Sequence, residues 1–444
     1  MKKYFYDIHC HAMNMSHPNF LAFIKRFEDM VFKDTDKFLK SNRLILLLAA
    51  NFLLIKFLFF KKFDYKNLVK ILKKTGVDKY PDRAKNLLAA MENDTGSFFL
   101  LMEECLMDNL VKNRKLIIDN KEYDKIIITP LIMDFGTKTV YYDEIHYNNR
   151  PINKPVVKQI IDIFNGIKNY KKLSRYNMLE IYPFMGINTT NYSLNEIRIM
   201  LNTYFDNYKG SHQAFKKKMG NFSGSMQNIA DNRYAGIKLY PPLGFDPWPE
   251  NKRELEKVQL LYDICQKKGI PITCHCSDEG FSIKNNKEME KLTSPLKWEK
   301  VLKNYNRLTL NLAHLGKQDH SDDWQKIILK LIIKHANVYS DISYRGFDNK
   351  FYEYLKKTIY SYKDSSIREK IKKRILFGSD FMINLLKTES YCDYFDVFSK
   401  TKHFTPDEKD YFCSINPQRF LFKNELAKFK PKTPSKSKLY HKKI

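Results

Sequence analysis

Short apolar segments rich in β-forming residues recur along the chain, and stretches of helical character, such as residues 252–268 and 323–335, separate them. Strands that alternate with helices favour parallel βαβ units, and eight such units close a (β/α)8 barrel of the TIM type. The sequence therefore predicts an α/β fold built on one such barrel. The eight runs are residues 4–11, 125–133, 178–187, 234–240, 270–276, 308–314, 338–343 and 375–380.

The chain has 444 residues, whereas a (β/α)8 barrel typically needs about 250. The surplus lies mainly between the first two runs, where residues 12–124 predict a long helical insertion. Residues 423–444 hold eight lysines, two prolines and one acidic residue, which is typical of a basic, disordered tail. We therefore expect one barrel domain over residues 1–422, insertion included, followed by this tail.

The charge is strongly basic, because 77 lysines and arginines outnumber 50 aspartates and glutamates and leave a net charge of +27. Such an excess permits contact with nucleic acid, an anionic membrane or an acidic ligand. Part of the excess belongs to the tail, and the rest is spread without a nucleic-acid motif. We therefore do not expect nucleic acid as a partner, and an acidic small-molecule substrate stays open.

The cysteines and the apolar segments bear on the compartment. Seven cysteines lack the density of a disulfide scaffold, and the first residues lack the apolar region of a secretory signal. We therefore expect reduced thiols and a cytoplasmic protein. Residues 44–60 are mostly apolar but include Lys56 and fall short of the roughly 20 residues of a spanning helix. We expect a buried helix there, or one that covers a subunit contact in a homo-oligomer, and favour membrane contact less.

The first run ends in the pair His9 and His11. Side chains alternate along a strand, so both imidazoles face the same side. Barrel enzymes place their sites at the carboxyl ends of the strands, and imidazole is a ligand for zinc and similar divalent ions. Later runs end in His275, His314 and Asp380. This order predicts a divalent metal site at one end of the barrel.

The same residues and the phrases around them resemble the amidohydrolase superfamily of metal-dependent barrels, and its amidohydrolase-2 branch in particular. The likeness covers islands between Tyr4 and Phe422 and leaves out the insertion and the tail. It implies a hydrolase in which one or two divalent ions, zinc foremost, activate the water that cleaves an amide, lactone, ester or related C–N or C–O bond. The phrases are Ala313-His314-Leu315-Gly316, Asn337-Val338-Tyr339-Ser340-Asp341, Ile375-Leu376-Phe377-Gly378-Ser379-Asp380 and Asn416-Pro417-Gln418-Arg419-Phe420-Leu421.

The resemblance also implies what the individual residues do. Asp380 would orient the attacking water and accept its proton, and His314 would bind a second ion or polarise the substrate carbonyl. The implied metal ligands are His9, His11, Lys238, His275, His314 and Asp380.

Lys238 ends the fourth run, where two-metal members of the superfamily carry a lysine that is carboxylated on its amine. A crowded electropositive pocket frees such an amine by lowering its pKa. The alternative is a plain ammonium that binds an acidic substrate. Amidohydrolase-2 members often lack this lysine and hold one metal, so its presence departs from the pattern of that branch. We favour the carboxylated bridge between two ions.

Two residues near the same end of the barrel are candidates for contact with the substrate. Tyr240 shares the inward face with Lys238, and Arg345 follows the seventh run within Tyr344-Arg345-Gly346. The guanidinium of Arg345 could hold a carboxylate or phosphate through two hydrogen bonds. A structural ion pair is the alternative role.

Three other functions compete with the hydrolase. A single-metal decarboxylase or hydratase would use the same barrel. A metal-dependent nuclease usually has a glutamate at the position of Lys238 and a different phrase around Asp380. A non-catalytic protein could retain the metal alone. The sequence favours the hydrolase acting on a small molecule and leaves the substrate undefined.

Overall fold

The computed structural model describes residues 2–14, 17, 81–109, 111–135, 154–219, 229, 231–282 and 286–423. The apolar segment 44–60, much of the insertion and all of the tail after residue 423 lie outside these described residues. Within the described ranges, no helix is both long enough and apolar enough to cross a membrane.

Each of the eight predicted runs contains at least one strand, and these strands pair in parallel. The run 178–187 supplies two strands, one to each of two sheets, with the orders β1-β5-β6 and β12-β11-β10-β9-β8-β7. The strands are β1 Tyr4–Cys10, β5 Lys125–Pro130, β6 Leu179–Ile181, β7 Phe184–Gly186, β8 Gly236–Leu239, β9 Ile272–Cys274, β10 Leu310–Leu312, β11 Val338–Asp341 and β12 Ile375–Leu376. The predicted α/β class with parallel strands is confirmed.

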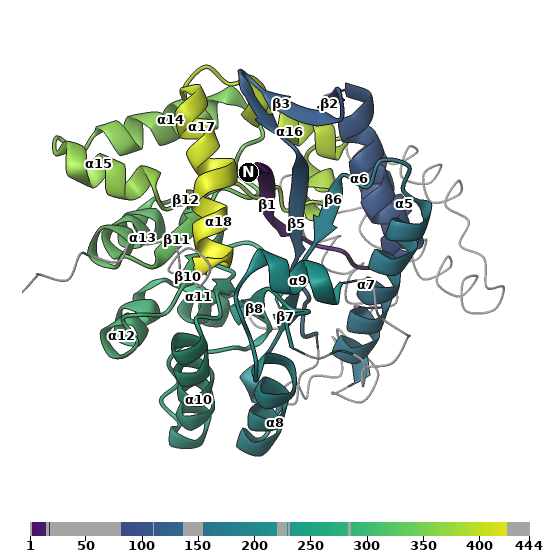
Figure 1. Cartoon of the computed structure of the whole chain (residues 1–444). Coiled ribbons are helices and arrows are strands. Elements are labelled where there is room, and N and C mark those ends of the chain that lie inside the picture. Colours follow the sequence, from purple (N-terminus) through teal and green to yellow (C-terminus); the bar gives the residue numbers. More distant parts are fainter. Residues whose placement is uncertain are drawn as a thin grey trace, which may run out of the picture.

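Backbone contacts connect the edges of the two sheets. Isolated parallel bridges join Cys10 to Phe381 and Leu131 to Phe184. The amide of Ile8 also donates to the carbonyl of Phe377 at 3.2 Å. Figure 1 shows the strands gathered at the centre with helices around them. Regular pairing among the described strands gives two linked sheets and no continuous closed ring.

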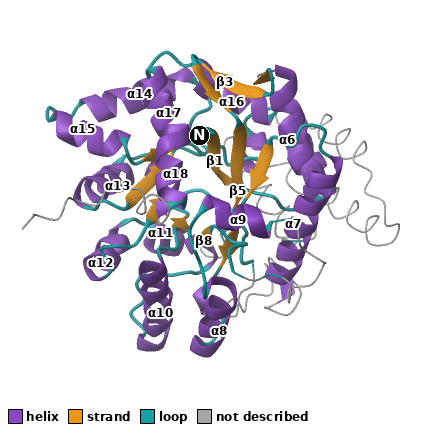
Figure 2. Ribbon diagram, viewed as in Figure 1, coloured by secondary structure: helices purple, strands orange, loops and turns teal. Residues whose placement is uncertain are grey.

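Helices follow most of these strands and surround the sheets (Figure 2). They are α7 Lys154–Leu173, α8 Leu194–Phe205, α9 His212–Lys218, α10 Lys252–Lys268, α11 Asn286–Thr293, α12 Leu296–Asn304, α13 Asp323–Lys334, α14 Asn349–Tyr360, α15 Ser365–Lys372, α16 Tyr391–Lys400, α17 Pro406–Asp410 and α18 Asn416–Leu421. Short helical turns complete the loops at η1 Thr189–Asn191, η3 Pro241–Leu243, η4 Ala313–Gly316, η5 Ile383–Leu386 and η6 Tyr411–Ile415.

The sequence of α10 explains its boundaries and its packing. Asn251 caps its first turn by accepting hydrogen bonds from two backbone amides, and Gly269 ends it with a φ of 69°. Val258, Leu261 and Cys265 are buried on one face. A spacing of three to four residues places these apolar side chains in a single stripe, which packs against the sheet.

The C-terminal helix α18 covers one end of the strands (Figure 1). The ring of Phe420 stacks on Phe184 at 6.3 Å between centroids and packs edge-on against Tyr339 at 5.4 Å. Both partners lie near the amino-terminal ends of their strands. The opposite, carboxyl-terminal ends are therefore the ones available for a site.

The described end of the insertion corrects the prediction that this region is helical. It begins with two helices, α5 Pro81–Glu92 and α6 Thr95–Asn109. A small antiparallel sheet follows, made of β2 Val111–Lys112, β3 Lys115–Ile118 and β4 Lys121–Tyr123. Asn113 and Arg114 have positive φ values of 51° and 62°, as a two-residue hairpin turn requires.

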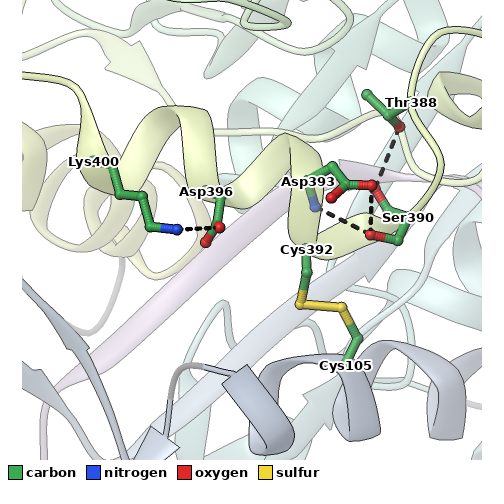
Figure 3. Close-up of a disulfide and its surroundings, with 7 residues drawn as sticks. All are labelled: Cys105, Thr388, Ser390, Cys392, Asp393, Asp396 and Lys400. Carbon is green, nitrogen blue, oxygen red and sulfur yellow. Dashed lines mark hydrogen bonds and ion pairs between the residues drawn. A yellow bond between two sulfur atoms is a disulfide. The ribbon is translucent and has the colours of Figure 1, made fainter.

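A disulfide joins Cys105 of α6 to Cys392 of α16 across a sequence separation of 287 residues (Figure 3). The expectation that all seven cysteines are reduced is therefore wrong for this pair. Spacing along the chain could not reveal it, because only the packing of the insertion against α16 brings the two residues together. The other five, Cys10, Cys265, Cys274, Cys276 and Cys413, are free and buried. The cytoplasmic location stays a prediction.

Candidate metal centre

Four histidines and one aspartate gather at the carboxyl ends of the strands, as the sequence predicts. His9 belongs to β1, His11 follows it, His275 follows β9, His314 lies in η4 and Asp380 follows β12. All five are buried. The ring of His314 lies 4.8 Å, between centroids, from the rings of both His9 and His275. The structure therefore brings together residues that the sequence separates by up to several hundred positions.

Each of three imidazoles bonds through its outer ring nitrogen to a backbone carbonyl. A carbonyl only accepts, so that nitrogen carries the hydrogen and the other nitrogen presents its lone pair to the cluster. Outer partners of this kind orient metal ligands in proteins. The pairs are His11 Nδ1 with Leu131 O at 3.1 Å, His275 Nε2 with Glu279 O at 2.8 Å and His314 Nδ1 with Ser343 O at 3.1 Å.

The fourth imidazole is held by a carboxylate. His9 Nδ1 lies 3.0 Å from Asp341 Oδ2, which also accepts from the amide nitrogen of Asn311 at 2.6 Å. Asp341 Oδ1 accepts from the backbone amide of His314 at 3.0 Å. Burial alone would raise the pKa of Asp341, but the neighbouring His9 and His314 hold it well below its ordinary value. Asp341 is therefore an anion that fixes two of the candidate ligands.

The inner atoms converge in two groups. His9 Nε2 and His11 Nε2 lie 3.4 Å and 3.3 Å from Asp380 Oδ1. His314 Nε2 lies 3.1 Å from His275 Nδ1. Both of these last two nitrogens carry lone pairs when the outer nitrogens hold the hydrogens, so two acceptors face each other. A cation between them would relieve that contact.

Buried polar atoms without hydrogen-bond partners also indicate a binding site for a cation. Within the described part of the chain, His9 Nε2, Asp380 Oδ1 and Lys238 Nζ have no hydrogen-bond partner. Buried polar atoms in proteins are nearly always paired, so such a cluster calls for a ligand. Two groups of residues have potential ligand atoms within 4.8 Å of one another. The first group is His9, His11 and Asp380, and the second is His9, His314 and Asp341. Imidazole and carboxylate are donors that suit zinc and related divalent ions.

Lys238 is buried on β8 beside these ligands, with its Nζ atom 5.7 Å from the centre of the Tyr240 ring. Burial lowers its pKa from 10.5 to about 8, against the opposing charges of Asp380 and Asp341. A larger fraction of neutral amine therefore exists near pH 7 than for an exposed lysine. The structure places Lys238 with the other predicted ligands.

Burial also favours the neutral form of the imidazoles. It lowers the pKa of His314 to about 4, with a further contribution from the electrostatic interaction with His9. The pKa of His275 is held well below 6.5, mainly by burial and next by the nearby His314. Burial also lowers the pKa of His11. Neutral imidazole is the form that binds metals, so these rings are ready for an ion near pH 7.

Asp380 sits in a constrained backbone position. Its φ is 59°, and its amide donates to the carbonyl of His9 at 2.7 Å. Burial would raise its pKa, but the close contact with His11 and the electrostatic interactions with His9 and His314 bring it below its ordinary value. Deeper in the strands, Asp7 accepts from the amides of His9 at 3.2 Å and Ser379 at 3.0 Å. Asp7 therefore ties β1 to the segment that carries Asp380.

A pocket opens onto these ligands, and the two predicted substrate residues differ in their relation to it. Tyr240 lines the pocket together with His11, His275, His314 and Asp380. Arg345 is not among the described lining residues, because its guanidinium lies over the ring of Phe351 at 5.2 Å. Its neighbour Tyr344 and the loop residue Lys317 line the pocket instead.

Sequence reasoning missed four contributors to this centre. Asp341 ends a phrase that carries the family resemblance, so its position was a signal that could have been used. Leu131, Ser343 and Glu279 contribute backbone carbonyls. Every residue has such a carbonyl, so no sequence signal could have found them.

Comparisons with known proteins give the following matches. Residues 226–423 match a family model described as amidohydrolase. The chain is similar to the 4-oxalomesaconate hydratase from Rhodopseudomonas palustris, with 12% identity over 96% of this chain and 97% of that chain and a TM-score of 0.42. A probable 2-pyrone-4,6-dicarboxylic acid hydrolase from Acinetobacter baumannii matches with 13% identity over 67% and 98% of the two chains and a TM-score of 0.37. A search of the curated proteins found no match.

Proposed function

We propose that this chain is a metal-dependent hydrolase of a small molecule in the amidohydrolase superfamily, which the match over residues 226–423 supports. The bond cleaved would be an amide, lactone, ester or related C–N or C–O bond. One observation carries the proposal: the buried imidazoles of His11, His275 and His314, each oriented by a backbone carbonyl, converge with Asp380 at the floor of a pocket. We keep the cytoplasm as the proposed location.

The residues present fit a divalent ion, and zinc is our proposal for it. His9, His11 and Asp380 would hold one ion, and His275 and His314 a second. Once bound, such an ion supplies a Lewis acid that lowers the pKa of water towards about 7 and polarises a carbonyl.

Asp380 is the group of this chain that handles the proton. It lines the pocket, and its lowered pKa keeps it ionised near pH 7. Its Oδ1 atom has no other hydrogen-bond partner among the described residues, so it is available to accept the proton of the attacking water. The same carboxyl group can return that proton to the leaving nitrogen or oxygen. Buried His9 and His11 on one side fix the position of this oxygen.

We further propose that Lys238 is carboxylated, and that its oxygens would help to hold the two ions. A bond would form between Nζ and the carbon of carbon dioxide, and the amine would lose a proton to solvent. The pKa of about 8 and the absence of a partner for Nζ within the described residues support this proposal. A plain ammonium would stay unpaired in the same position. We also propose that the two sheets close into one (β/α)8 barrel, which the bridges at their edges support.

Elemental analysis and a hydrolysis screen test the function. Purified without chelator, the full chain should hold two divalent ions and hydrolyse at least one lactone, ester or amide. His11→Asn should lose an ion and the activity, whereas the matched change of exposed His320 to Asn should lose neither. Release of carbon dioxide from aromatic acids with one ion per chain would instead identify a decarboxylase. A chain that binds no metal would refute the proposal.

A further inference from the structure

The pocket above the candidate metal centre has an apolar wall, whereas its floor is made of the polar candidate ligands. Its apolar lining comes from loops after four separate strands. Most of these side chains cluster with Tyr240 and Leu243, whereas Leu386 lines the pocket and packs against the main core. The wall residues, named the apolar wall below, are Met13, Met133, Phe135, Phe281, Ile383 and Leu386.

The charges beside the apolar wall are neutralised within the protein. Among the described lining residues, Lys317 is the one lysine, and no arginine lines the pocket. Lys317 Nζ forms an ion pair with Glu279 and lies 3.1 Å from Asp319 Oδ1. Its positive charge is therefore already taken up by two carboxylates.

The balance at this face is acidic. Asp278 accepts from the amide of Asp319 at 2.7 Å, which adds a third carboxylate to the two around Lys317. The phenol of Tyr344 responds to this field: burial first, and the negative charges of Glu279, Asp380 and Asp319 after it, raise its pKa. A second anion brought to this position would meet these carboxylates and no free cation among the described lining residues, although Lys387 Nζ lies behind the lining, 4.9 Å from the centre of the Tyr344 ring.

The reacting end of a substrate and its remote part therefore meet different surroundings. Ions at the floor would attract a polarised carbonyl, whatever the rest of the molecule carries. The remote part would lie against the apolar wall, where burying carbon is favourable and an unpaired charge is costly. The earlier option of an acidic substrate is not supported by this arrangement.

We propose that the substrate is an uncharged small molecule with an apolar body, such as an alkyl or aryl lactone, ester or amide. This inference rests on the proposed function for the bond that is cleaved and adds the class of molecule that carries the bond.

Lactones of increasing chain length test the proposal on the zinc-loaded full chain. γ-Butyrolactone, γ-caprolactone and γ-nonalactone would be compared with a lactone whose side chain ends in a carboxylate. We expect kcat/KM to rise by about fourfold for each added methylene until the pocket is filled. The terminal carboxylate should lower kcat/KM by tenfold or more. A flat series, or preference for the carboxylate, overturns the proposal.

Variants of the apolar wall show whether this surface sets the preference. Leu386→Ala should lower kcat/KM for γ-nonalactone about tenfold and change the value for γ-butyrolactone less than twofold. Leu296→Ala is the matched control, because Leu296 lies on α12 and is 56% exposed. Equal loss on both lactones in Leu386→Ala, with normal metal content, contradicts a role for the wall.

A binding measurement separates this inference from the proposed function. Octanohydroxamic acid and the hydroxamic acid of equal length that ends in a carboxylate share a metal-binding head and differ in the tail. Calorimetry on the zinc-loaded chain should show at least tenfold tighter binding of the apolar tail, and Leu386→Ala should abolish the difference. If the apolar tail binds more tightly but no lactone, ester or amide is hydrolysed, the proposed function is refuted and the inferred substrate class is not. Hydrolysis of lactones with equal binding of both tails would refute the substrate class alone.

Discussion

The Nδ1 atom of His9 lies 3.0 Å from the Oδ2 atom of Asp341, although 332 positions of sequence separate the two residues. The carboxylate also holds the amide of His314, so it connects both groups of candidate metal ligands. A buried anion behind the imidazole of His9 fixes the orientation of that ring, and its bond to the backbone of His314 fixes the segment that carries the second ligand. Asp341 is thus a positioning residue for the whole centre.

Replacing Asp341 by Asn should weaken zinc binding about 10- to 100-fold, because the neutral amide no longer fixes the ring of His9. Competition with a chromophoric chelator measures the affinity, and circular dichroism checks that the fold is retained. Asp323→Asn is the matched control on α13, where the carboxylate is 70% exposed. An unchanged affinity in Asp341→Asn would show that this contact does not support the centre.

The metal-free protein should lose stability as the pH falls from 6.5 to 4. The pKa of His314 is about 4 in the folded chain, whereas an exposed histidine in the unfolded chain has a pKa of about 6.5. Only the unfolded chain therefore gains the proton in this pH interval. The free energy of unfolding then decreases by about 3 kcal/mol from this group. Denaturant titrations at several pH values measure it. His314→Asn should make the decrease shallower, and a slope equal to that of the wild type would contradict the prediction.

Gly280→Ala should disturb the second group of ligands. Gly280 has a φ of 125°, and a Cβ atom there would lie 2.5 Å from Tyr240 Oη and 3.1 Å from His275 Nε2. The loop would have to move, and the Glu279 carbonyl that orients His275 would move with it. We expect the variant to bind one ion where the wild type binds two.

Gly269→Ala provides the control for this change, because Gly269 also has a positive φ but ends α10 away from the pocket. It should lower the melting temperature and keep the full metal content. Two ions in Gly280→Ala would argue against a role of the loop.

Reduction of the Cys105–Cys392 disulfide should destabilise the protein. The bond ties α6 of the insertion to α16 (Figure 3). Removing a cross-link over so long a loop costs about 2–5 kcal/mol. Dithiothreitol should therefore lower the melting temperature in scanning fluorimetry. The double variant Cys105→Ser, Cys392→Ser should melt at the lower temperature with or without the reductant, and a wild type insensitive to reductant would refute the prediction.

Much of the fold could be predicted because the strands are apolar and most of them are separated by helices. Even β12, only Ile375–Leu376 as a paired strand, lies inside a recognisable run. The small sheet β2-β3-β4 was missed because its strands are short and mostly polar or half-buried. Leu116, Ile118 and Tyr123 do face the core, but runs of two to four residues are too short for an apolar pattern to identify them as strands.

Some residues of the candidate site could also be predicted from the sequence, and others could not. His9, His11, His275, His314 and Asp380 could be found, since each ends a run and strand ends meet at one face of a barrel. The orientation of Arg345 could not be predicted. Its side chain is long enough to enter the pocket or to lie over the ring of Phe351, and only the packing of the folded chain determines which position it takes. A rule about strand ends locates residues but does not orient long side chains.

The hydrogen bonds on the outer nitrogens of the imidazoles have a thermodynamic consequence. Each ring hydrogen is already assigned to an acceptor in the protein before any ion arrives. Uptake of an ion then expels no hydrogen from the rings of His11, His275 and His314 above pH 6.5, whereas a thiolate site releases protons as it fills. The imidazole contribution to the heat of metal uptake should accordingly be the same in buffers of different ionisation enthalpy.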